Sequence, residues 1–281
     1  MKALLICPAD RPAVARLAEP APLAALPFLG KSLVEYWLEH LATRGAKIVL
    51  IVTSDHPSHL RAIVGDGARW GICAEIIPES RELSVSEARV RYCDGDSDHW
   101  LALPDDAVLM DHLPGLPEIK LFESYANWFA ALQAWRPRTA TPDRIGLREI
   151  SPGVWLGLHA RVAPSAQLRA PCWIGANVSI GPDAVIGPEA IVEDRVVVEA
   201  GARILHSAIA PETFVGRLTL IKDSLACGPL LINWKTSSCL RVPDAFLLCT
   251  FNECRRITQP ASWLGRLAAM LAMIASAPLA L

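Results

Sequence analysis

Residues 154–206 read VWLGLHARVAPSAQLRAPCWIGANVSIGPDAVIGPEAIVEDRVVVEAGARILH, and every sixth residue of this stretch is aliphatic. The residue two positions before each aliphatic one is small or compact. The aliphatic positions are Leu156, Val162, Leu168, Ile174, Ile180, Ile186, Val192, Val198 and Ile204. A period of six fits neither an α-helix nor an ordinary array of hairpins. It predicts a solenoid in which each six-residue unit, or hexad, supplies one short strand and a corner, three hexads close a coil, and the aliphatic side chains point inward.

This repeat resembles the hexapeptide-repeat family, and the resemblance implies a left-handed parallel β-helix over residues 151–254. After Ile204 the register shifts, because Ile209 and Val215 keep the aliphatic position only if one residue is lost from a hexad. The later apolar runs predict strands over residues 218–225, 230–234 and 245–250. Such strands would cover the end of the solenoid, which otherwise exposes unpaired strand edges.

The composition indicates a globular chain large enough for two domains. Of 281 residues, 52% are hydrophobic and 20% charged, and the net charge is −2. We therefore expect no nucleic-acid partner, since no basic excess is available to bind a phosphate backbone. The eight cysteines show no C-x-x-C pair and no metal-ligand spacing, which favours a reducing cytoplasmic setting. The first apolar run is too short for a signal peptide.

The N-terminal part alternates predicted strands and helices. Apolar runs predict strands over residues 2–7, 47–53 and 72–77, and helices over 33–43 and 56–64. Residues 80–120 are polar and acidic, apart from a short strand-like run at 107–110. A further helix is predicted over 122–135, followed by a Pro- and Thr-rich linker over 136–150. This order predicts an α/β layer with a parallel sheet over residues 1–135.

Three segments of this part resemble the nucleotidyltransferase domain of sugar-nucleotide pyrophosphorylases. They are LPFLGKS (26–32) leading into LVEY (33–36), GICAEIIPE (71–79), and the closing helix that begins FESYAN (122–127). The order of closing helix, linker and hexapeptide repeats also resembles that family. The resemblance implies a shortened Rossmann-like nucleotidyltransferase domain in front of the β-helix, and a sugar nucleotide or sugar phosphate as ligand.

The sequence departs from this family where phosphate would bind. Family members carry a glycine-rich loop whose N–H groups hold the phosphates, whereas PADRPA (8–13) contains no glycine and two prolines. The signature lysine of the family falls near Leu23, among apolar residues. Arg11 and Lys31 are the candidate substrate-binding residues, with a solvated loop arginine as the alternative for Arg11. Asp111 is the candidate ligand for Mg²⁺, required if the domain is active, with an ordinary loop aspartate as the alternative.

The repeats suggest a second chemistry. Many hexapeptide-repeat proteins transfer acetyl groups to an amino or hydroxyl group, with a histidine as general base and an active site between subunits. His159 and His206 lie in or beside the repeats and are the catalytic candidates, with surface histidines as the alternative. No acidic residue is obviously placed in the sequence to orient either ring. This reading implies a homo-oligomer, for example a trimer.

The last segment, residues 261–281, is about 20 mostly apolar residues with Arg266 as its only charge. It follows Arg255 and Arg256, which favour the cytoplasmic side of a membrane. It resembles the first hydrophobic helix of bacterial polyprenyl-phosphate sugar transferases. The alternatives are a simple membrane anchor and a helix docked on the protein itself.

Together these features predict a degenerate pyrophosphorylase-like protein, acting as a binding or regulatory module in surface-polysaccharide synthesis at the cytoplasmic side of the inner membrane. Two alternatives stay open. One is a hexapeptide-repeat acyltransferase, and the other is the N-terminal part of a membrane sugar-phosphate transferase.

Overall fold

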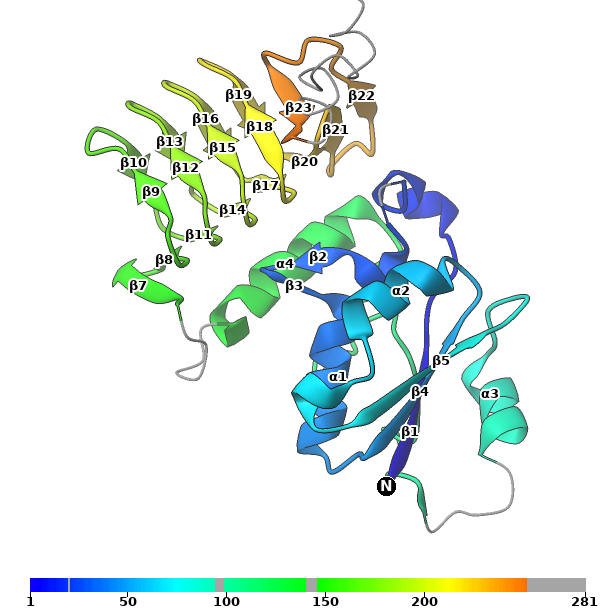
Figure 1. The fold of residues 1–281 in the computed structure, drawn as a ribbon. Coiled ribbons are helices and arrows are strands. Elements are labelled where there is room, and N and C mark those ends of the chain that lie inside the picture. The colour runs from blue at the N-terminus through cyan, green and yellow to red at the C-terminus, as the bar shows by residue number, and fades with distance from the viewer. Residues whose placement is uncertain (20, 94–98, 140–145, 252–281) are drawn as a thin grey trace, which may run out of the picture.

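The computed structural model describes residues 1–19, 21–93, 99–139 and 146–251. It has two parts, an α/β layer at the N-terminus and a β-helix at the C-terminus, with helix α4 (Tyr125–Thr139) between them (Figure 1). The mixed α/β class with a repetitive C-terminal part is therefore confirmed, while the assignment of the first part to the nucleotidyltransferases stays a prediction. No helix of the described ranges is long and apolar enough to cross a membrane. The predicted tail, 261–281, lies outside the described residues.

The N-terminal sheet has four parallel strands in the order β5-β4-β1-β6. These are β1 (Lys2–Ile6), β4 (Ile48–Thr53), β5 (Cys73–Pro78) and β6 (Ala107–Leu109), at the positions that the apolar runs predict. Successive side chains of a strand point to opposite faces, so Leu5 packs with helices α1 (Leu33–Thr43) and α2 (Pro57–Val64). Leu4 packs with helix α3 (Val85–Tyr92) on the other face.

Two helices differ from the sequence prediction. Helix α3 lies in the polar segment for which no helix was predicted. The Ser84 N–H donates to the Glu87 carboxylate at 2.9 Å and so forms part of a capping box, but Ala88 is the helix's only buried residue, which leaves no apolar periodicity to detect. Helix α4 starts at Tyr125 and ends at Thr139, so residues 122–124 precede the helix rather than belonging to it, and residues 136–139 are helical rather than linker. Pro137 lies inside the helix, two residues before its end, and has no N–H to donate to the carbonyl four residues earlier.

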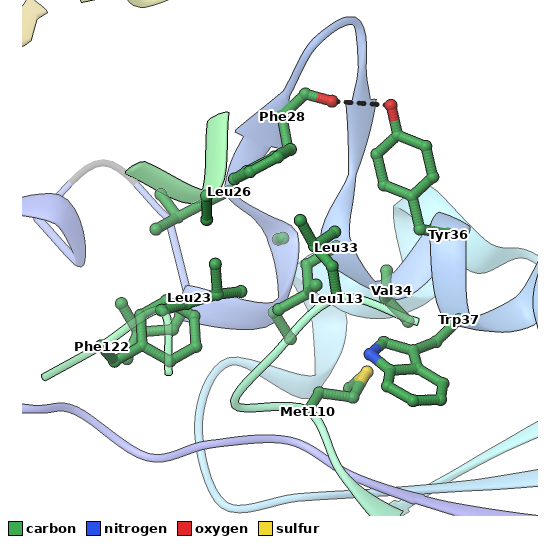
Figure 2. Packing of buried hydrophobic residues seen from close by; sticks show 14 of the residues in the cluster. Leu23, Leu26, Phe28, Leu33, Val34, Tyr36, Trp37, Met110, Leu113 and Phe122 are labelled. Carbon is green, nitrogen blue, oxygen red and sulfur yellow. Dashed lines mark hydrogen bonds between the residues drawn. The ribbon is translucent and has the colours of Figure 1, made fainter. Parts of the chain in front are cut away.

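The segment between β1 and α1 supplies several side chains to the core of the first part. It contains short 3-10 helices (Pro12–Leu17 and Leu23–Ala25) and a hairpin of β2 (Pro27–Phe28) and β3 (Lys31–Ser32). Leu23 and Phe28 are buried among Leu33, Leu113 and Phe122 (Figure 2). The Tyr36 hydroxyl donates to the Phe28 carbonyl at 2.9 Å. An apolar core side chain thus stands where the resembled family has its lysine.

The β-helix has three parallel faces built from hexads. The first face contains β8 (Val154–Leu156), β11 (Cys172–Ile174), β14 (Ala190–Val192), β17 (Ala208–Ile209) and β20 (Ser224–Cys227). The second contains β9 (Arg161–Val162), β12 (Ser179–Ile180), β15 (Val197–Val198) and β18 (Thr213–Val215). The third contains β10 (Gln167–Leu168), β13 (Val185–Ile186), β16 (Arg203–Leu205) and β19 (Leu220–Lys222). Most of the predicted aliphatic positions are buried in one cluster, which confirms the inward orientation.

The register shift after Ile204 is confirmed by the strand pairing. The first coils repeat every 18 residues, since Val154, Cys172 and Ala190 are aligned partners. The next coils repeat every 17, since Ile191 pairs with Ala208 and Ala208 with Leu225. The later predicted runs form β21 (Leu230–Asn233) and β23 (Leu248–Thr250), which pair antiparallel to strands of the last coil. Two further antiparallel strands were not predicted, β7 (Arg148–Ser151) before the first coil and β22 (Cys239–Arg241) beside β21.

The glycine that follows several aliphatic positions is required by the close approach of neighbouring coils. A Cβ added at Gly157 would lie 2.5 Å from the carbonyl carbon of Gly175, and one at Gly175 would lie 2.8 Å from the Asp194 nitrogen. These contacts are with backbone atoms, which cannot move aside without shifting a coil. Tight stacking, rather than an unusual backbone angle, explains glycine at these two positions.

Helix α4 and the β2–β3 hairpin join the two parts. Trp173, Ile191 and Ala208 of the first β-helix face belong to the same buried cluster as α1 and α4. The Glu193 carboxylate, at a β-helix corner, accepts the N–H groups of Leu29 (2.6 Å) and Gly30 (2.8 Å) at the tip of the hairpin. A continuous core therefore extends from the α/β layer to the first face of the β-helix.

Candidate functional site

One corner of the β-helix stacks ionisable side chains from three successive coils. Because the coil here is 17 residues long, Glu189, His206 and Asp223 occupy equivalent corners, and all three have left-handed backbone conformations with φ between 47° and 51°. The His206 N–H donates to the Pro188 carbonyl at 2.9 Å, and the Asp223 N–H to the Leu205 carbonyl at 3.2 Å. The stack therefore places the acid of one coil beside the histidine of the previous coil.

The His206 ring lies next to a carboxylate. Its Nδ1 is 3.9 Å from the Asp223 Oδ1, and the side chains are 38% and 16% exposed, respectively. This distance is longer than a hydrogen bond but short enough for an ion pair when the imidazole is protonated. The Lys235 ammonium lies 2.9 Å from the same Asp223 oxygen. A half-exposed histidine with a carboxylate on its Nδ1 side can accept a proton at Nε2, which is the arrangement that a general base needs.

Aromatic packing from helix α4 holds this corner in place. The Trp234 indole N–H donates to the His206 carbonyl at 3.0 Å. The Trp234 ring stacks on Phe129 of α4, with centroids 4.6 Å apart and planes 14° from parallel. The Gln133 side chain, one turn further along α4, donates to the Glu189 carbonyl at 3.2 Å. Side chains of α4 therefore pack against this corner and hold it in place.

The surroundings of His159 and His206 differ in the structure, although the sequence alone gave no reason to prefer one of them. His159 is exposed at another corner, on the first coil, with φ of 58°. The equivalent corner of the next coil carries Asn177 rather than an acid. Within the described ranges, the His159 ring has no hydrogen-bond or ion-pair partner. Asp223 was missed at the sequence level, although the shifted register contains the signal, because residue 223 follows His206 by one coil of 17 residues.

In the α/β part, Arg11 and Asp111 lie at the same end of the sheet, while Lys31 lies elsewhere. The Arg11 guanidinium forms an ion pair with Glu82 at 2.7 Å. That hydrogen bond raises the pKa of Arg11, which burial lowers, and the nearby Glu82 and Asp111 charges add to the rise. Lys31, in β3, binds both carboxylate oxygens of Glu39 at 2.6 and 2.8 Å. Both predicted substrate-binding cations are therefore paired with acids of the chain.

Asp111 follows β6 and interacts with two basic side chains. Its Oδ1 is 2.6 Å from the His112 Nδ1 and 3.0 Å from the Lys120 Nζ. Burial would raise the pKa of Asp111, but the hydrogen bonds with His112 and Lys120 outweigh it, and the pKa is lowered. An ammonium group on a carboxylate does not suit Mg²⁺ coordination. In the part of the chain that the structure describes, no group of three or more His, Cys, Asp or Glu side chains could hold a metal ion.

A cavity of about 370 Å³ lies between the two parts, next to β17, the strand that follows His206. Its walls include Trp128 and Leu132 of α4, Ala208 of β17 and Cys227 of β20. Burial raises the pKa of the Cys227 thiol to about 12, which makes it a poor nucleophile near neutral pH.

Comparison with known proteins identifies the repeats. A family model described as bacterial transferase hexapeptide (six repeats) matches residues 171–206, which end at His206. No curated protein matches the chain. A crystal structure of a mutant perosamine N-acetyltransferase from Caulobacter crescentus, in complex with CoA and GDP-perosamine, is 14% identical, and the match covers 66% of this chain and 94% of that one. Its TM-score of 0.18 is too low to support any inference about fold or function.

Proposed function

We propose that this chain is a hexapeptide-repeat acyltransferase in which His206 is the general base. The observation that carries the proposal is the position of His206 on the coil before Asp223, with 3.9 Å between Nδ1 and Oδ1. The match of residues 171–206 to transferase hexapeptide repeats supports it. The pyrophosphorylase-like reading stays a prediction from resemblance, and the internal ion pairs of Arg11 and Asp111 do not favour it.

The chemistry assigns each residue one task. Asp223 accepts a hydrogen bond from the Nδ1–H group of His206, which fixes the proton on Nδ1 and keeps the Nε2 lone pair available. Nε2 takes the proton from an acceptor hydroxyl or amine as that group attacks the carbonyl of an acyl thioester. The carbon–sulfur bond breaks, and the thiolate leaves and receives the proton. The Nδ1–Oδ1 contact must shorten for this task, as catalytic hydrogen bonds often do when substrate binds.

The acceptor class follows from the sequence resemblance. We propose a sugar nucleotide or sugar phosphate with a free amino or hydroxyl group. The predicted homo-oligomer, and membrane contact through residues 261–281, remain predictions of the same kind.

The decisive experiment incubates the full chain with acetyl-CoA and a panel of amino- and hydroxy-sugar nucleotides and sugar phosphates. Product is detected by mass spectrometry, because the exposed Cys73 and Cys239 would react with a thiol reagent. His206→Asn should lower kcat at least about 100-fold, the usual size of a general-base contribution. His159→Asn is the matched control and should retain activity. Equal loss in both variants, or the absence of product with every acceptor, would contradict the proposal.

A further inference from the structure

The cavity beside β17 lies between the α/β part and the β-helix, and the proposed acyl transfer does not use it. Its volume is about 370 Å³, and most of its walls are buried apolar side chains, among them Leu26, Trp128 and Leu225. Cavities of this size and lining, at the junction of two parts of a fold, are typical small-molecule sites. The cavity therefore has the size and the walls that a ligand of its own needs.

The interior of the cavity favours an alkyl group over a charged one. An apolar cavity of about 150 Å³ stays free of water and binds a molecule as large as benzene, so on that scale this one takes an alkyl chain of about ten carbon atoms. The Glu193 carboxylate in its wall is buried and accepts the Leu29 and Gly30 N–H groups. A second negative charge beside this carboxylate would be repelled, so an anionic end of a ligand has to stay at the opening.

The opening of the cavity carries an excess of positive charge. Arg16, Glu19 and Arg241 line the cavity and are exposed, which places them at its rim. Arg16 forms an ion pair with Glu19, and the Arg241 Nη2 lies 3.8 Å from the other oxygen of the same carboxylate. Two guanidinium groups therefore share one acid, and a carboxylate from a ligand would balance the remaining charge. Guanidinium groups suit that role because their paired N–H groups match the two oxygens of a carboxylate.

We propose that the cavity binds an unbranched alkyl chain of about ten carbon atoms that ends in a carboxylate, the class of medium-chain fatty acids. The alkyl chain lies against Trp128 and Cys227, and the carboxylate stays at the rim between Arg16 and Arg241. Such a ligand contacts helix α4 and the β-helix at the same time, so its binding stabilises the junction of the two parts. The site does not depend on the acyl-transfer proposal.

Calorimetric titration of the full chain with decanoate, below its micelle concentration, tests the site. Decanoate should bind in a saturable way. Octanoate and hexanoate should bind more weakly, by about fourfold for each methylene removed, because each buried methylene contributes a similar transfer free energy. Monodecanoyl lysophosphatidic acid in a parallel titration distinguishes two sources of the alkyl chain. Tighter binding than decanoate assigns the site to a lipid, and weaker binding assigns it to the free acid.

A substitution inside the cavity tests where the alkyl chain lies. Cys227→Phe fills the cavity and should lower decanoate affinity at least about tenfold, since the phenyl ring takes the place of several methylenes. Cys73→Phe is the matched control, because Cys73 is exposed on β5 and does not line the cavity. It should bind decanoate like the unmodified chain. Thermal unfolding of both variants shows that they fold.

A substitution at the rim tests the charged end. Arg241→Gln should weaken decanoate binding by about threefold to fivefold, the effect of one partly exposed ion pair. It should leave the binding of decan-1-ol unchanged, because the alcohol carries no charge. Arg217→Gln is the control, since Arg217 is exposed on the β-helix away from the cavity. If Cys227→Phe does not fold, this pair of variants and the series of chain lengths still test the site.

Three results would overturn the proposal. The first is the absence of saturable decanoate binding to the unmodified chain, which would point to the apolar residues 261–281 as the occupant of the cavity. The second is an equal loss of affinity in Cys227→Phe and Cys73→Phe. The third is an equal effect of Arg241→Gln on decanoate and on decan-1-ol.

Discussion

The Glu193 carboxylate on the β-helix and the Leu29 backbone N–H on the β2–β3 hairpin are joined by a buried hydrogen bond of 2.6 Å. The same carboxylate accepts the Gly30 N–H at 2.8 Å. Leu29 and Gly30 both have positive φ angles, of 54° and 82°, and their N–H groups converge on one acceptor as a result. This contact holds the hairpin against the β-helix, and it joins residues that are 163 positions apart in the chain.

Glu193→Ala should destabilise the junction by about 2 kcal/mol, because it leaves two N–H groups without their carboxylate acceptor in a largely buried place. Urea unfolding followed by tryptophan fluorescence measures the change. Glu199→Ala, on the following hexad and only partly buried, is the control and should change the free energy of unfolding by no more than about 0.5 kcal/mol. Equal stability of the two variants would show that the Glu193 contact does not hold the junction.

Gly157→Ala should destabilise the β-helix by about 2 kcal/mol. The added methyl would meet the backbone of Gly175 and Ala176 at 2.5 to 2.6 Å, so the coils must separate. Thermal unfolding measures the effect. Gly45→Ala is a useful comparison, since a Cβ there meets nothing within 4 Å and the cost comes from its φ of 93° alone. A Gly157→Ala chain as stable as the unmodified one would mean that the coils are not tightly stacked at this corner.

The stability of the chain should fall as pH rises above 9, in part because of Cys7. Burial raises the pKa of this thiol from 9.0 to about 12, partly offset by a hydrogen bond with Thr53. Between these values the folded state keeps the proton that the unfolded state loses, so the contribution is complete below pH 9 and is lost toward pH 12. At pH 10 the loss is about 1 kcal/mol.

The measurement is urea unfolding at pH 7, 9 and 10, with Cys7→Ala as the variant that reduces this dependence by the contribution of Cys7, while Cys172 and Cys227, whose pKa values burial also raises, keep theirs. Other groups also titrate in this range, and the exposed Cys239 provides the control for a thiol outside the core. Cys239→Ala should keep the pH dependence of the unmodified chain. The assignment to Cys7 is wrong if Cys7→Ala keeps it as well.

Asp223 and Lys235 should have opposite effects on acyl transfer. Asp223→Asn removes the acceptor beside His206 Nδ1 and should lower kcat about tenfold or more while leaving KM nearly unchanged, because Asp223 positions the base and does not bind substrate. Lys235→Met releases the Asp223 oxygen that the ammonium holds at 2.9 Å, and should maintain or raise kcat. Steady-state kinetics of both variants over pH 6 to 9 separates the two roles. Equal losses in both would indicate that the corner is only structural.

The elements of the fold were largely predictable because each leaves a periodic signal. The hexads mark the inward side chain of every short strand, and the apolar runs at 2–7 and 47–53 mark buried parallel strands. Helix α3 left no such signal, since Ala88 alone is buried, and its capping residues Ser84 and Glu87 were the only indication. Helix α4 was predicted to end four residues too early because a proline and three polar residues make its last turn look like a linker.

The candidate site was less predictable from the sequence than the elements of the fold. His206 could be singled out from the sequence, but so could His159, and nothing local distinguishes them. Asp223 becomes a neighbour of His206 only when one coil is closed, because the contact joins residues 17 positions apart. Trp234 and Lys235 lie at this corner because strand β21, which they follow, runs antiparallel to β20. Phe129 comes from helix α4.

By itself the sequence determined that the chain forms a β-helix preceded by a parallel α/β layer, because both depend on local repeats of apolar residues that must be buried. The tertiary structure alone decided which charged groups meet. It placed Asp223 beside His206, Glu82 on Ala9 and Arg11, and Glu193 on the β2–β3 hairpin. These partners are 17 to 164 residues apart. The 17-residue coil after Ile204 is a signal for the Asp223–His206 contact alone, and no periodic pattern records the other two, since each is a single event of packing.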